Sequence, residues 1–341
     1  MSEFFKNKSI LVTGACGTVG SEIISILSNL KHSSTKVIGI DNNENAIFYF
    51  DNLFAEDQMV SFRLADIRES EDILPLMRGI DIVIHSAAYK HVMLSEVSPN
   101  QFIQTNVYGL QNMISCATEA DVQVFINTSS DKAVNPTNIM GVTKLLGEKL
   151  VTTANQQFGS TVFASTRFGN VLGSAGSVFP IFLNQIKEGK PLTLTSKKMT
   201  RFVMSINQAA QLVLDSAAIA NGGEIFVTKM PVISILDLAQ SMIDEFSVHY
   251  GRRAEELYIS EIGAKQGEKM FEELMNQEET RRTLELSKFY VIQPPFVDKE
   301  ITDQYENIIS QEVEIPYNSE DENKLSGTDI KNLLKDYGLL K

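Results

Sequence analysis

Residues 9–30 read SILVTGACGTVGSEIISILSNL, and this stretch decides the fold. A β-branched run ends at Thr13, three glycines follow at Gly14, Gly17 and Gly20, and an amphipathic segment begins directly after them. A glycine triplet that follows a strand and opens a helix is typical of dinucleotide-binding domains, whereas the triplet alone is weak evidence. The first glycine permits a tight turn, the second lets backbone approach a pyrophosphate, and the third lets helix and strand pack closely. The stretch therefore predicts a strand, turn and helix that bind a nucleotide, rather than a glycine-rich turn without a ligand.

The alternation of short β-branched runs with helical spacing continues from Ser9 to about Val134. Such alternation is typical of right-handed crossovers that build a parallel sheet. The predicted strands are 9–13, 36–41, 60–64, 80–85, 122–128 and 163–168, and the predicted helices are 20–30, 45–57, 69–78, 100–120 and 138–158. The sequence thus predicts an α/β fold, a Rossmann-type doubly wound parallel sheet with a smaller mixed α/β domain. We expect 1–170 to bind the dinucleotide, 171–300 mainly to bind substrate while interleaving with the first part, and 301–341 to be an acidic surface extension or connector that leads into a final short helix.

Length and composition restrict the class of protein. The chain has 341 residues, which is more than one core usually holds, and 43% of them are hydrophobic and 21% charged. The net charge of −13 argues against a general nucleic-acid binder, which needs a basic face. No apolar run approaches the roughly 20 residues of a membrane helix, and the N-terminal sequence leaves no room for a signal peptide. Because Cys16 and Cys116 also lack metal-ligand or disulfide spacing, we expect a cytoplasmic protein with no membrane insertion and no metal site.

An acidic residue, Asp41, ends the second predicted strand. A carboxylate about twenty residues beyond the glycines accepts bonds from the adenosine ribose hydroxyls and repels a 2′-phosphate. The next residues, Asn42, Asn43 and Glu44, include no lysine or arginine that could receive such a phosphate, so NAD is favoured over NADP. Asp66 ends the third predicted strand and is a candidate for the adenine amino group, with a turn carboxylate as the alternative.

Four longer motifs accompany the glycine motif. They are HSAAYKHV at 85–92, SSDKAVNPTNIMGVTKLLGEKL at 129–150, FGNVLGSAGSVFP at 168–180 and IGAKQGEKMFEEL at 262–274. With these motifs, the chain from about Lys8 to Tyr290 resembles the polysaccharide-biosynthesis group of UDP-N-acetylglucosamine 4,6-dehydratases, which are extended short-chain dehydrogenases/reductases. The resemblance implies an NAD-dependent enzyme, a nucleotide-sugar substrate and a homo-oligomer. The predicted cofactor contacts are Gly14, Gly17, Thr18, Val19, Gly20, Asp41, Asn42, Asp66, Ile67, Ala87, Ala88 and Lys144.

The superfamily's tyrosine position is occupied by Met140, four residues before Lys144. In this superfamily a tyrosine and a lysine at that spacing normally carry out the alcohol oxidation. Residues four apart lie on one helix face, so we expect Lys144 to hold the nicotinamide ribose while Met140 only packs nearby. A thioether cannot accept a proton. The same replacement occurs in one branch of the dehydratase family, so it moves the proton transfer elsewhere without indicating an inactive enzyme.

The resemblance places Ser130, Asp131 and Lys132 at the end of a strand that faces the nicotinamide. In a 4,6-dehydratase, hydride leaves C4 for NAD, a base removes the C5 proton, an acid protonates the departing C6 hydroxyl, and hydride returns to C6. We assign Lys132 as the base, because Lys144 and the oxidised nicotinamide are expected to lower its pKa, and Asp131 as the acid. Ser130 is expected to contact the sugar. The order of proton transfers stays open, and a surface ion pair is the structural alternative for Asp131 and Lys132.

Five further residues are predicted to contact the substrate. Lys90 and His91 follow a strand that should pass the nicotinamide, although a lone histidine is more often structural. By resemblance, Asn170 and Arg201 contact the diphosphate through an amide and a guanidinium group. Glu268 is a candidate for the nucleoside ribose, with a solvent-facing role as the alternative. The family pattern usually has an arginine near position 265, where this chain has lysine, so UDP is the default nucleotide and GDP the alternative.

Two other functions compete with the dehydratase. A nucleotide-sugar 4-epimerase shares the fold and the cofactor, but it usually keeps the tyrosine and has no use for an acid and a base at C5 and C6. A non-catalytic NAD-binding regulator could lose the tyrosine, but it need not retain Lys132, Lys144 and Arg201 together. The sequence therefore favours a dehydratase that gives a 4-keto-6-deoxy sugar.

Overall fold

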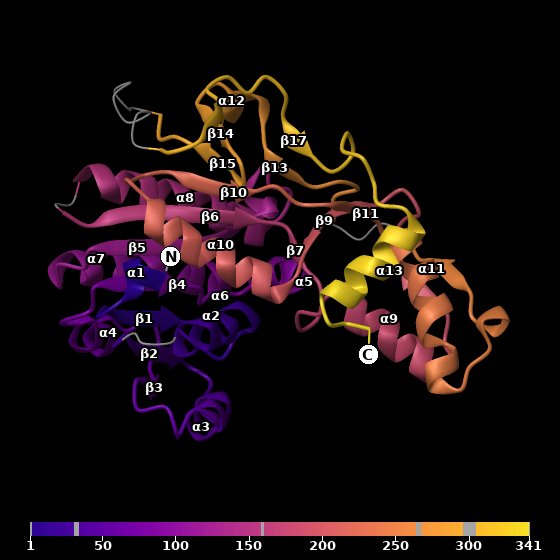
Figure 1. Cartoon of the computed structure of the whole chain (residues 1–341), viewed down its shortest axis with the longest axis horizontal. Helices are drawn as coiled ribbons and strands as arrows, with labels where there is room; N and C mark the ends of the chain where they lie inside the picture. Colours follow the sequence, from indigo (N-terminus) through magenta and orange to yellow (C-terminus); the bar gives the residue numbers. More distant parts are fainter. Residues whose placement is uncertain (1, 31–33, 158–159, 264–266, 296–304, 341) are drawn as a thin grey trace.

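The computed structural model describes residues 2–30, 34–157, 160–263, 267–295 and 305–340. Its centre is a ten-stranded sheet with the order β16-β14-β15-β10-β6-β5-β4-β1-β2-β3 (Figure 1). The strands are β1 (Ser9–Thr13), β2 (Lys36–Asp41), β3 (Val60–Leu64), β4 (Ile82–His85), β5 (Val124–Ser130), β6 (Val162–Phe168), β10 (Ile225–Thr228), β14 (Thr283–Leu286), β15 (Phe289–Ile292) and β16 (Ile308–Ser310). From β3 across to β10 all neighbours are parallel, whereas β15, β14 and β16 add an antiparallel edge. The predicted parallel α/β sheet is confirmed, and the strand order reverses at β1, where ligands of such sheets bind.

Helices cover both faces of this sheet (Figure 1). Successive residues of β1 point to opposite faces, so Ile10 and Val12 join one core with α2 and α10, while Leu11 joins a second core with α4, α7 and α8. The helices are α1 (Ser2–Phe5), α2 (Thr18–Ser28), α3 (Glu44–Leu53), α4 (Ser70–Met77), α5 (Val92–Val97), α6 (Pro99–Ile103), α7 (Leu110–Glu119), α8 (Ile139–Gln157) and α10 (Ile206–Ile219). The bounds of α2, α3, α4 and α8 lie within a few residues of the prediction, and position 158 falls outside the described residues. The sequence did not single out α1, α5 and α10.

The single helix predicted for 100–120 is wrong. A π-helical turn, η1 (Gln104–Gly109), separates α6 from α7. Within it, the Asn106 side chain accepts a hydrogen bond from the Tyr89 amide (2.8 Å) and donates to the Tyr89 carbonyl (3.0 Å) and to Thr143 Oγ1 (3.0 Å). Such turns occur mostly inside helices near functional sites. Through Asn106, the turn connects Tyr89, which follows β4, to Thr143 of α8, the helix that carries Lys144.

A smaller lobe is built mainly from later residues and lies beside the carboxyl ends of the sheet (Figure 1). Its elements are β7 (Asn170–Val171), α9 (Val178–Glu188), β8 (Leu192–Leu194), β9 (Thr200–Met204), β11 (Val232–Ser234), α11 (Ile235–Phe246), η3 (Val248–Tyr250), η4 (Ala254–Glu256), β12 (Ile259–Glu261) and α13 (Gly327–Asp336). Strands β11, β9 and β7 form its central sheet. Three further elements, β13 (Glu273–Met275), α12 (Gln277–Thr280) and β17 (Tyr317–Asn318), lie next to β14 and β15 at the edge of the main sheet (Figure 1). The chain returns from this lobe to the main sheet through α10, β10, β14 and β15, so the two parts interleave.

The C-terminal residues are not the extension that we expected for 301–341. Among the described residues, β16 joins the main sheet, β17 pairs with β13, and α13 packs against α11 with Ile330 and Leu334 fully buried. The acidic composition misled the prediction, because the apolar residues of α13 recur at helical spacing and form one buried stripe.

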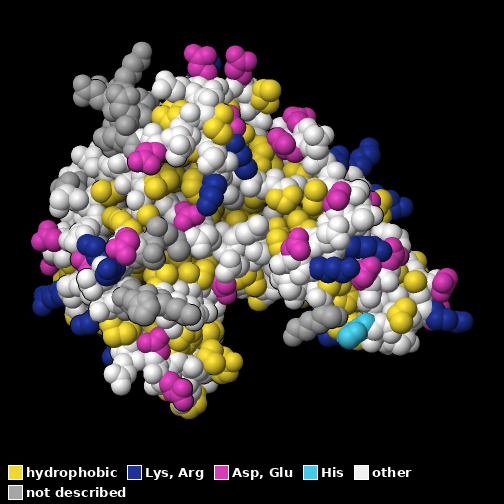
Figure 2. Space-filling model, in the orientation of Figure 1, with side chains coloured by type: hydrophobic (Ala, Val, Ile, Leu, Met, Phe, Trp, Pro, Cys, Tyr) yellow, Lys and Arg dark blue, Asp and Glu magenta, His cyan; other side chains and the backbone are white. Residues whose placement is uncertain are grey.

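The surface in Figure 2 carries acidic and basic side chains scattered over the face, and it is hollowed between α3 and the small lobe. None of the helices in the described ranges is long and apolar enough to cross a bilayer. Within those same ranges, no group of three or more histidine, cysteine, aspartate or glutamate residues is arranged to hold a metal ion.

Candidate active site

The glycine loop between β1 and α2 is packed tightly against the end of β4. Gly14 has a φ of +63°, and a Cβ there would lie 2.8 Å from the backbone nitrogen and Cα of Ala87. The Gly17 amide donates to the Gly14 carbonyl (2.9 Å), and a Cβ on Gly20 would overlap that carbonyl oxygen. Helix α2 begins at Thr18 with no side-chain cap on its first amides. This geometry provides the close backbone approach and the open helix N-terminus that a pyrophosphate requires.

Eight of the predicted cofactor contacts surround one cavity of about 170 Å³. They are Gly14, Gly17, Asp41, Asn42, Asp66, Ile67, Ala87 and Ala88, and the sequence did not single out the other lining residues, Ile40, Ala65, Ser86, Tyr89 and Thr105. Thr18, Val19, Gly20 and Lys144 are not among the lining residues. The cavity therefore joins segments from β1, β2, β3 and β4 at the carboxyl edge of the sheet.

The two carboxylates of this cavity differ in their partners. Asp41 accepts hydrogen bonds from the backbone amides of Cys16 (3.2 Å) and Asn43 (3.1 Å). Asp66 forms a two-fold contact with the Arg68 guanidinium group (2.9 and 2.6 Å), which lowers the pKa of Asp66 to about 2, and it also accepts from Asn42 (3.2 Å). Both carboxyl groups are therefore held in place by neighbouring donors.

Helix α8 places the predicted lysine in the interior of the site. Lys144 donates to the Thr128 carbonyl (2.9 Å), and burial lowers its pKa to about 8, with Glu148 opposing the shift. Met140 is buried, one turn earlier on the same helix. A Cβ on Gly141 would overlap the Lys132 carbonyl oxygen, so α8 begins in direct contact with the turn that follows β5. The two motifs that carry Lys132 and Lys144 are thus brought together.

The residues Ser130, Asp131 and Lys132 form a hydrogen-bonded group at the end of β5. Asp131 lies in the 3-10 turn η2 (Asp131–Ala133) and is fully buried. Its Oδ1 atom accepts from Ser130 Oγ (2.7 Å) and Lys132 Nζ (2.9 Å), while Oδ2 has no partner among the described residues. The pair is therefore not a surface ion pair, because one member has no solvent exposure.

The expected pKa of Lys132 is wrong in direction. Burial alone lowers the pKa of the ammonium group, but the Asp131 and Glu272 carboxylates outweigh it, so the pKa of Lys132 is raised above its ordinary value. The Glu272 Oε1 atom lies 3.5 Å from Lys132 Nζ and 3.7 Å from Arg201 Nε. This carboxylate was not predicted beside Lys132, because it comes from a segment far along the chain.

Sequence reasoning missed Glu272 as a site residue. It is buried, its Oε2 atom has no partner in the described ranges, and burial raises its pKa, although the charges of Lys132 and Arg201 oppose the rise. The quoted motif GEKMFEEL contains three glutamates, and nothing in the letters shows which one turns inward. Pairing of the following strand β13 with β17 fixes that direction.

The predicted substrate residues lie on two sides of the site. Lys90 donates to the Ala175 carbonyl (2.9 Å), and a Cβ on Gly176 would lie 2.8 Å from the His91 ring, so both residues meet the 168–180 motif. Asn170 starts β7, and its Oδ1 atom is buried without a partner in the described structure.

Arg201 contacts the backbone of residues 269 and 270, and Glu268 belongs to the same segment. The guanidinium group of Arg201 donates hydrogen bonds to the backbone carbonyls of Thr200 (2.7 Å), Met270 (3.2 Å) and Lys269 (2.8 Å). Both of its terminal nitrogens therefore already have backbone partners. Glu268 accepts from Thr195 (2.9 Å).

A second buried ionic group, also missed by sequence reasoning, joins three elements behind the site. The guanidinium group of Arg167, in β6, contacts Glu148 of α8 (2.9 and 2.6 Å) and Glu279 of α12 (3.0 and 2.9 Å). All three residues are buried. Burial alone would lower the pKa of Arg167, but the two carboxylates overcome it and raise the pKa, so the group is fully charged.

Replacing Arg167 by methionine is expected to destabilise the fold strongly. Arg167→Met leaves two carboxylates buried without their cation, which lowers the free energy of unfolding by about 3–5 kcal/mol. Urea unfolding followed by circular dichroism measures the change. The matched control is Lys190→Met, which breaks an exposed pair with Glu188 and should leave the midpoint unchanged. Equal midpoints for Arg167→Met and the wild type would contradict a stabilising role of the buried cation.

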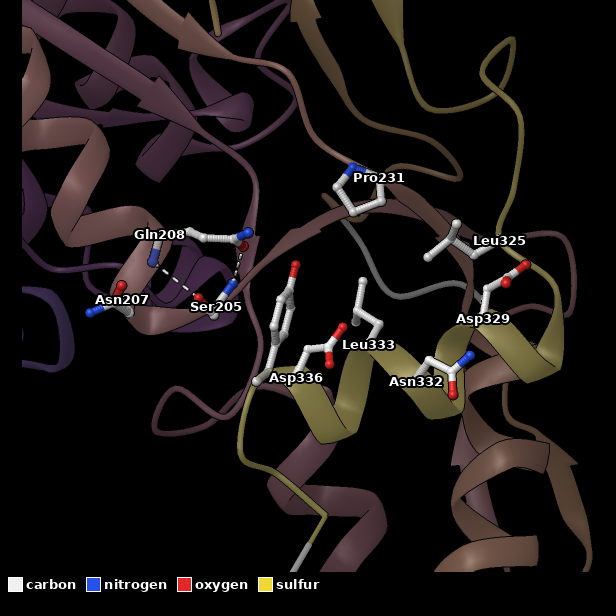
Figure 3. Close-up of a pocket in the computed structure, with 10 residues that line it drawn as sticks. Ser205, Asn207, Gln208, Pro231, Leu325, Asp329, Asn332, Leu333 and Asp336 are labelled. Carbon is white, nitrogen blue, oxygen red and sulfur yellow. Dashed lines mark hydrogen bonds between the residues drawn. The ribbon is translucent and has the colours of Figure 1, made fainter.

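A larger cavity of about 660 Å³ lies away from these motifs, between α10 and α13 (Figure 3). Ser205 and Gln208 form the capping box of α10 on one side, and Asp336, Leu333 and Asn332 of α13 line the other. It contains none of the predicted catalytic or cofactor residues. The motifs that the sequence singled out therefore lie around the smaller cavity and the carboxyl ends of β1, β4 and β5, and not around this larger one.

Comparison with known proteins identifies the family of the chain. Residues 10–294 match the family model described as polysaccharide biosynthesis protein. An uncharacterized membrane protein of Methanocaldococcus jannaschii is 42% identical and covers 100% of this chain and 99% of its own length. The UDP-N-acetylglucosamine 4,6-dehydratase (inverting) of Campylobacter jejuni is 38% identical over 87% of this chain and 86% of its own length. A UDP-glucose 4-epimerase of Rickettsia massiliae is 37% identical, covering 84% of this chain and 83% of its own.

A solved structure, Pen from Bacillus thuringiensis, matches with a TM-score of 0.91 and 38% identity, covering 99% of this chain and 100% of its own. The likeness thus includes both the sheet and the small lobe. The chain belongs to the family of polysaccharide biosynthesis proteins.

Proposed function

We propose that the protein is an NAD-dependent nucleotide-sugar 4,6-dehydratase whose substrate is UDP-N-acetylglucosamine. The observation that carries the proposal is the pair formed by buried Asp131 and partly buried Lys132 at the carboxyl end of β5, beside a helix that keeps Lys144 and lacks the tyrosine. An epimerase needs no acid and base of this kind. The Campylobacter relative named for 4,6-dehydration supports the same choice.

The residues around the smaller cavity fit NAD. The Asp41 carboxylate would accept from the adenosine ribose, the loop at Gly14 and Gly17 would contact the pyrophosphate, and Asp66 would lie at the adenine end. When bound, NAD would supply the hydride acceptor for oxidation at C4 of the sugar and the hydride donor for reduction at C6. Lys144, whose ammonium group already donates to the Thr128 carbonyl, would hold the nicotinamide ribose.

The proton transfers are assigned to Asp131 and Lys132. Lys132 would remove the C5 proton, which the C4 ketone makes acidic, and later return a proton to C5. Asp131 would take the O4 proton in place of the missing tyrosine and deliver it to the departing O6, because its Oδ2 atom has no partner among the described residues. Met140 would pack against the sugar or the nicotinamide, and Ser130, which donates to Asp131, would orient that carboxyl group.

The nucleotide sugar would lie between the end of the sheet and the small lobe. Lys90 and His91 would contact the hexose, Asn170 and Arg201 the diphosphate, and Glu268 the nucleoside ribose. The unpartnered Oδ1 atom of Asn170 supports its part in this assignment. Arg201 would have to exchange some of its carbonyl contacts for phosphate oxygens.

The test is to incubate the purified protein and NAD separately with UDP-N-acetylglucosamine and GDP-N-acetylglucosamine, and to follow each by liquid chromatography and mass spectrometry. We expect the UDP sugar, without added reductant, to give a product lighter by one water molecule. The same result with the GDP sugar alone would change the nucleotide assignment. An unchanged mass with a C4 epimer would favour the epimerase, and NAD binding without turnover of either sugar would favour the regulator.

A further inference from the structure

The requirements of the proposed chemistry conflict with the charge state of Lys132. A base must be neutral before it accepts the C5 proton, yet the pKa of Lys132 is raised by the carboxylates beside it. At neutral pH the group is therefore an ammonium ion. Some other group has to take this proton before dehydration begins.

Glu272 is placed to receive it. Its Oε1 atom lies 3.5 Å from Lys132 Nζ, and its Oε2 atom is buried without a partner in the described residues. The backbone amide of Glu272, not its carboxylate, is held by Ser319 (2.9 Å), so the carboxylate is left to the charged group. Burial also raises the pKa of Glu272, which lowers the cost of placing a proton on this carboxylate.

We propose that Glu272 is a positioning residue for the dehydration, which holds the Lys132 ammonium group next to Asp131 and receives the proton that Lys132 must release before it acts as a base. The inference rests on the dehydratase proposed above. It adds a third ionisable side chain to the pair that the sequence predicted.

The proton count closes over one turnover. The proton on Lys132 Nζ moves to the Glu272 carboxylate, which leaves a neutral amine and a neutral acid. Asp131 takes the O4 proton as C4 is oxidised; Lys132 then takes the C5 proton, and Asp131 gives its proton to O6, which leaves as water. The hydride that left C4 for NAD is returned to C6, and Lys132 returns its proton to C5, which leaves the neutral amine and the neutral acid. Glu272 then gives its proton back to Lys132, and the starting charges are restored.

Four charged groups surround Glu272, and all contribute to its protonation. Asp131 and Lys132 face it from η2, Arg201 from β9, and Lys269 from the preceding segment. Burial raises the pKa of Glu272, Asp131 adds to the rise, and the three cations oppose it. A carboxyl group under this balance can bind the Lys132 proton and return it.

The test compares the pH dependence of kcat for the wild type and Glu272→Gln, both saturated with NAD and UDP-N-acetylglucosamine. In the wild type the proton moves within the cluster, so kcat is flat around neutral pH. In Glu272→Gln the proton must leave to solvent, so kcat at pH 7 falls at least about tenfold and rises about tenfold per pH unit in the alkaline direction. A role in packing alone would lower kcat equally at every pH, and an unchanged profile would likewise overturn the proposal.

Two further variants complete the experiment. Glu273→Gln is the matched control, because its carboxylate contacts Lys269 and Asn135 instead of Lys132, and it should keep the wild-type profile. Glu272→Asp keeps a carboxylate and should keep the flat profile at a lower rate; it carries the test if the glutamine variant does not fold, and a rising profile for it would overturn the inference. A wild type that dehydrates no nucleotide sugar would instead refute the proposed function.

Discussion

Replacing Lys132 by arginine is expected to reduce kcat by about 10²–10⁴-fold while the fold and NAD binding are kept. Arginine retains the positive charge between Asp131 and Glu272, so neither buried carboxylate loses its partner. A guanidinium group, however, does not release its proton in proteins, so it cannot remove the proton from C5. Steady-state kinetics give kcat, and calorimetric titration with NAD shows whether the binding site is intact.

A matched control for this variant is Lys149→Arg, an exposed position on α8, which should leave kcat unchanged. If Lys132→Arg kept kcat within tenfold of the wild type, Lys132 would not be the C5 base. The role would then pass to another group of the site, and the charge of Lys132 would matter more than its proton.

Replacing Gly14 by alanine is expected to weaken NAD binding at least about a hundredfold, which corresponds to about 2.7 kcal/mol. The added Cβ would lie 2.8 Å from backbone atoms of Ala87, which cannot move aside as a flexible side chain would. The φ of +63° at Gly14 adds strain of about 1–2 kcal/mol for any residue with a Cβ. Calorimetric titration with NAD measures the affinity.

The strain and the overlap can be separated with Gly79→Ala. Gly79 has a φ of +78° but nothing within 4 Å of its added Cβ, so this variant carries the backbone strain alone. It should bind NAD as the wild type does. Wild-type affinity in Gly14→Ala would show that the glycine loop is not the pyrophosphate site.

The sheet and the placement of the motifs were predictable because they depend on local patterns. The β-branched runs that end at Thr13 and Asp41 became parallel neighbours, and the carboxyl ends of parallel strands meet at one edge. Asp41 and Asp66 therefore reached the same cavity, as the sequence predicted. Their contacts with NAD stay a prediction.

The electrostatics of the site were not predictable, because they depend on residues far apart in the chain. The pKa of Lys132 is raised by its sequence neighbour Asp131 and further by Glu272, and Glu272 lies next to β13, which pairs with β17 far along the chain. Arg167 likewise meets Glu279 from a distant short helix. The charge pattern within one segment does not show which distant charged side chains will contact it in the folded protein.

The C-terminal segment shows a related limit. Its acidic composition suggested an extension, but two buried side chains, Ile330 and Leu334, decide where α13 lies. The sequence predicted a final short helix, but it did not predict that the apolar stripe of this helix packs against α11. That contact joins segments far apart in the chain, so no local pattern shows it.

The most direct test of dehydration is to incubate the wild-type protein, NAD and UDP-N-acetylglucosamine in deuterated water without a reductant, and to locate the deuterium in the product by NMR. If Lys132 removes and returns the C5 proton, the product lacks one molecule of water and carries solvent deuterium at C5. A product of unchanged mass, or one that has lost water but carries no deuterium at C5, would contradict the account.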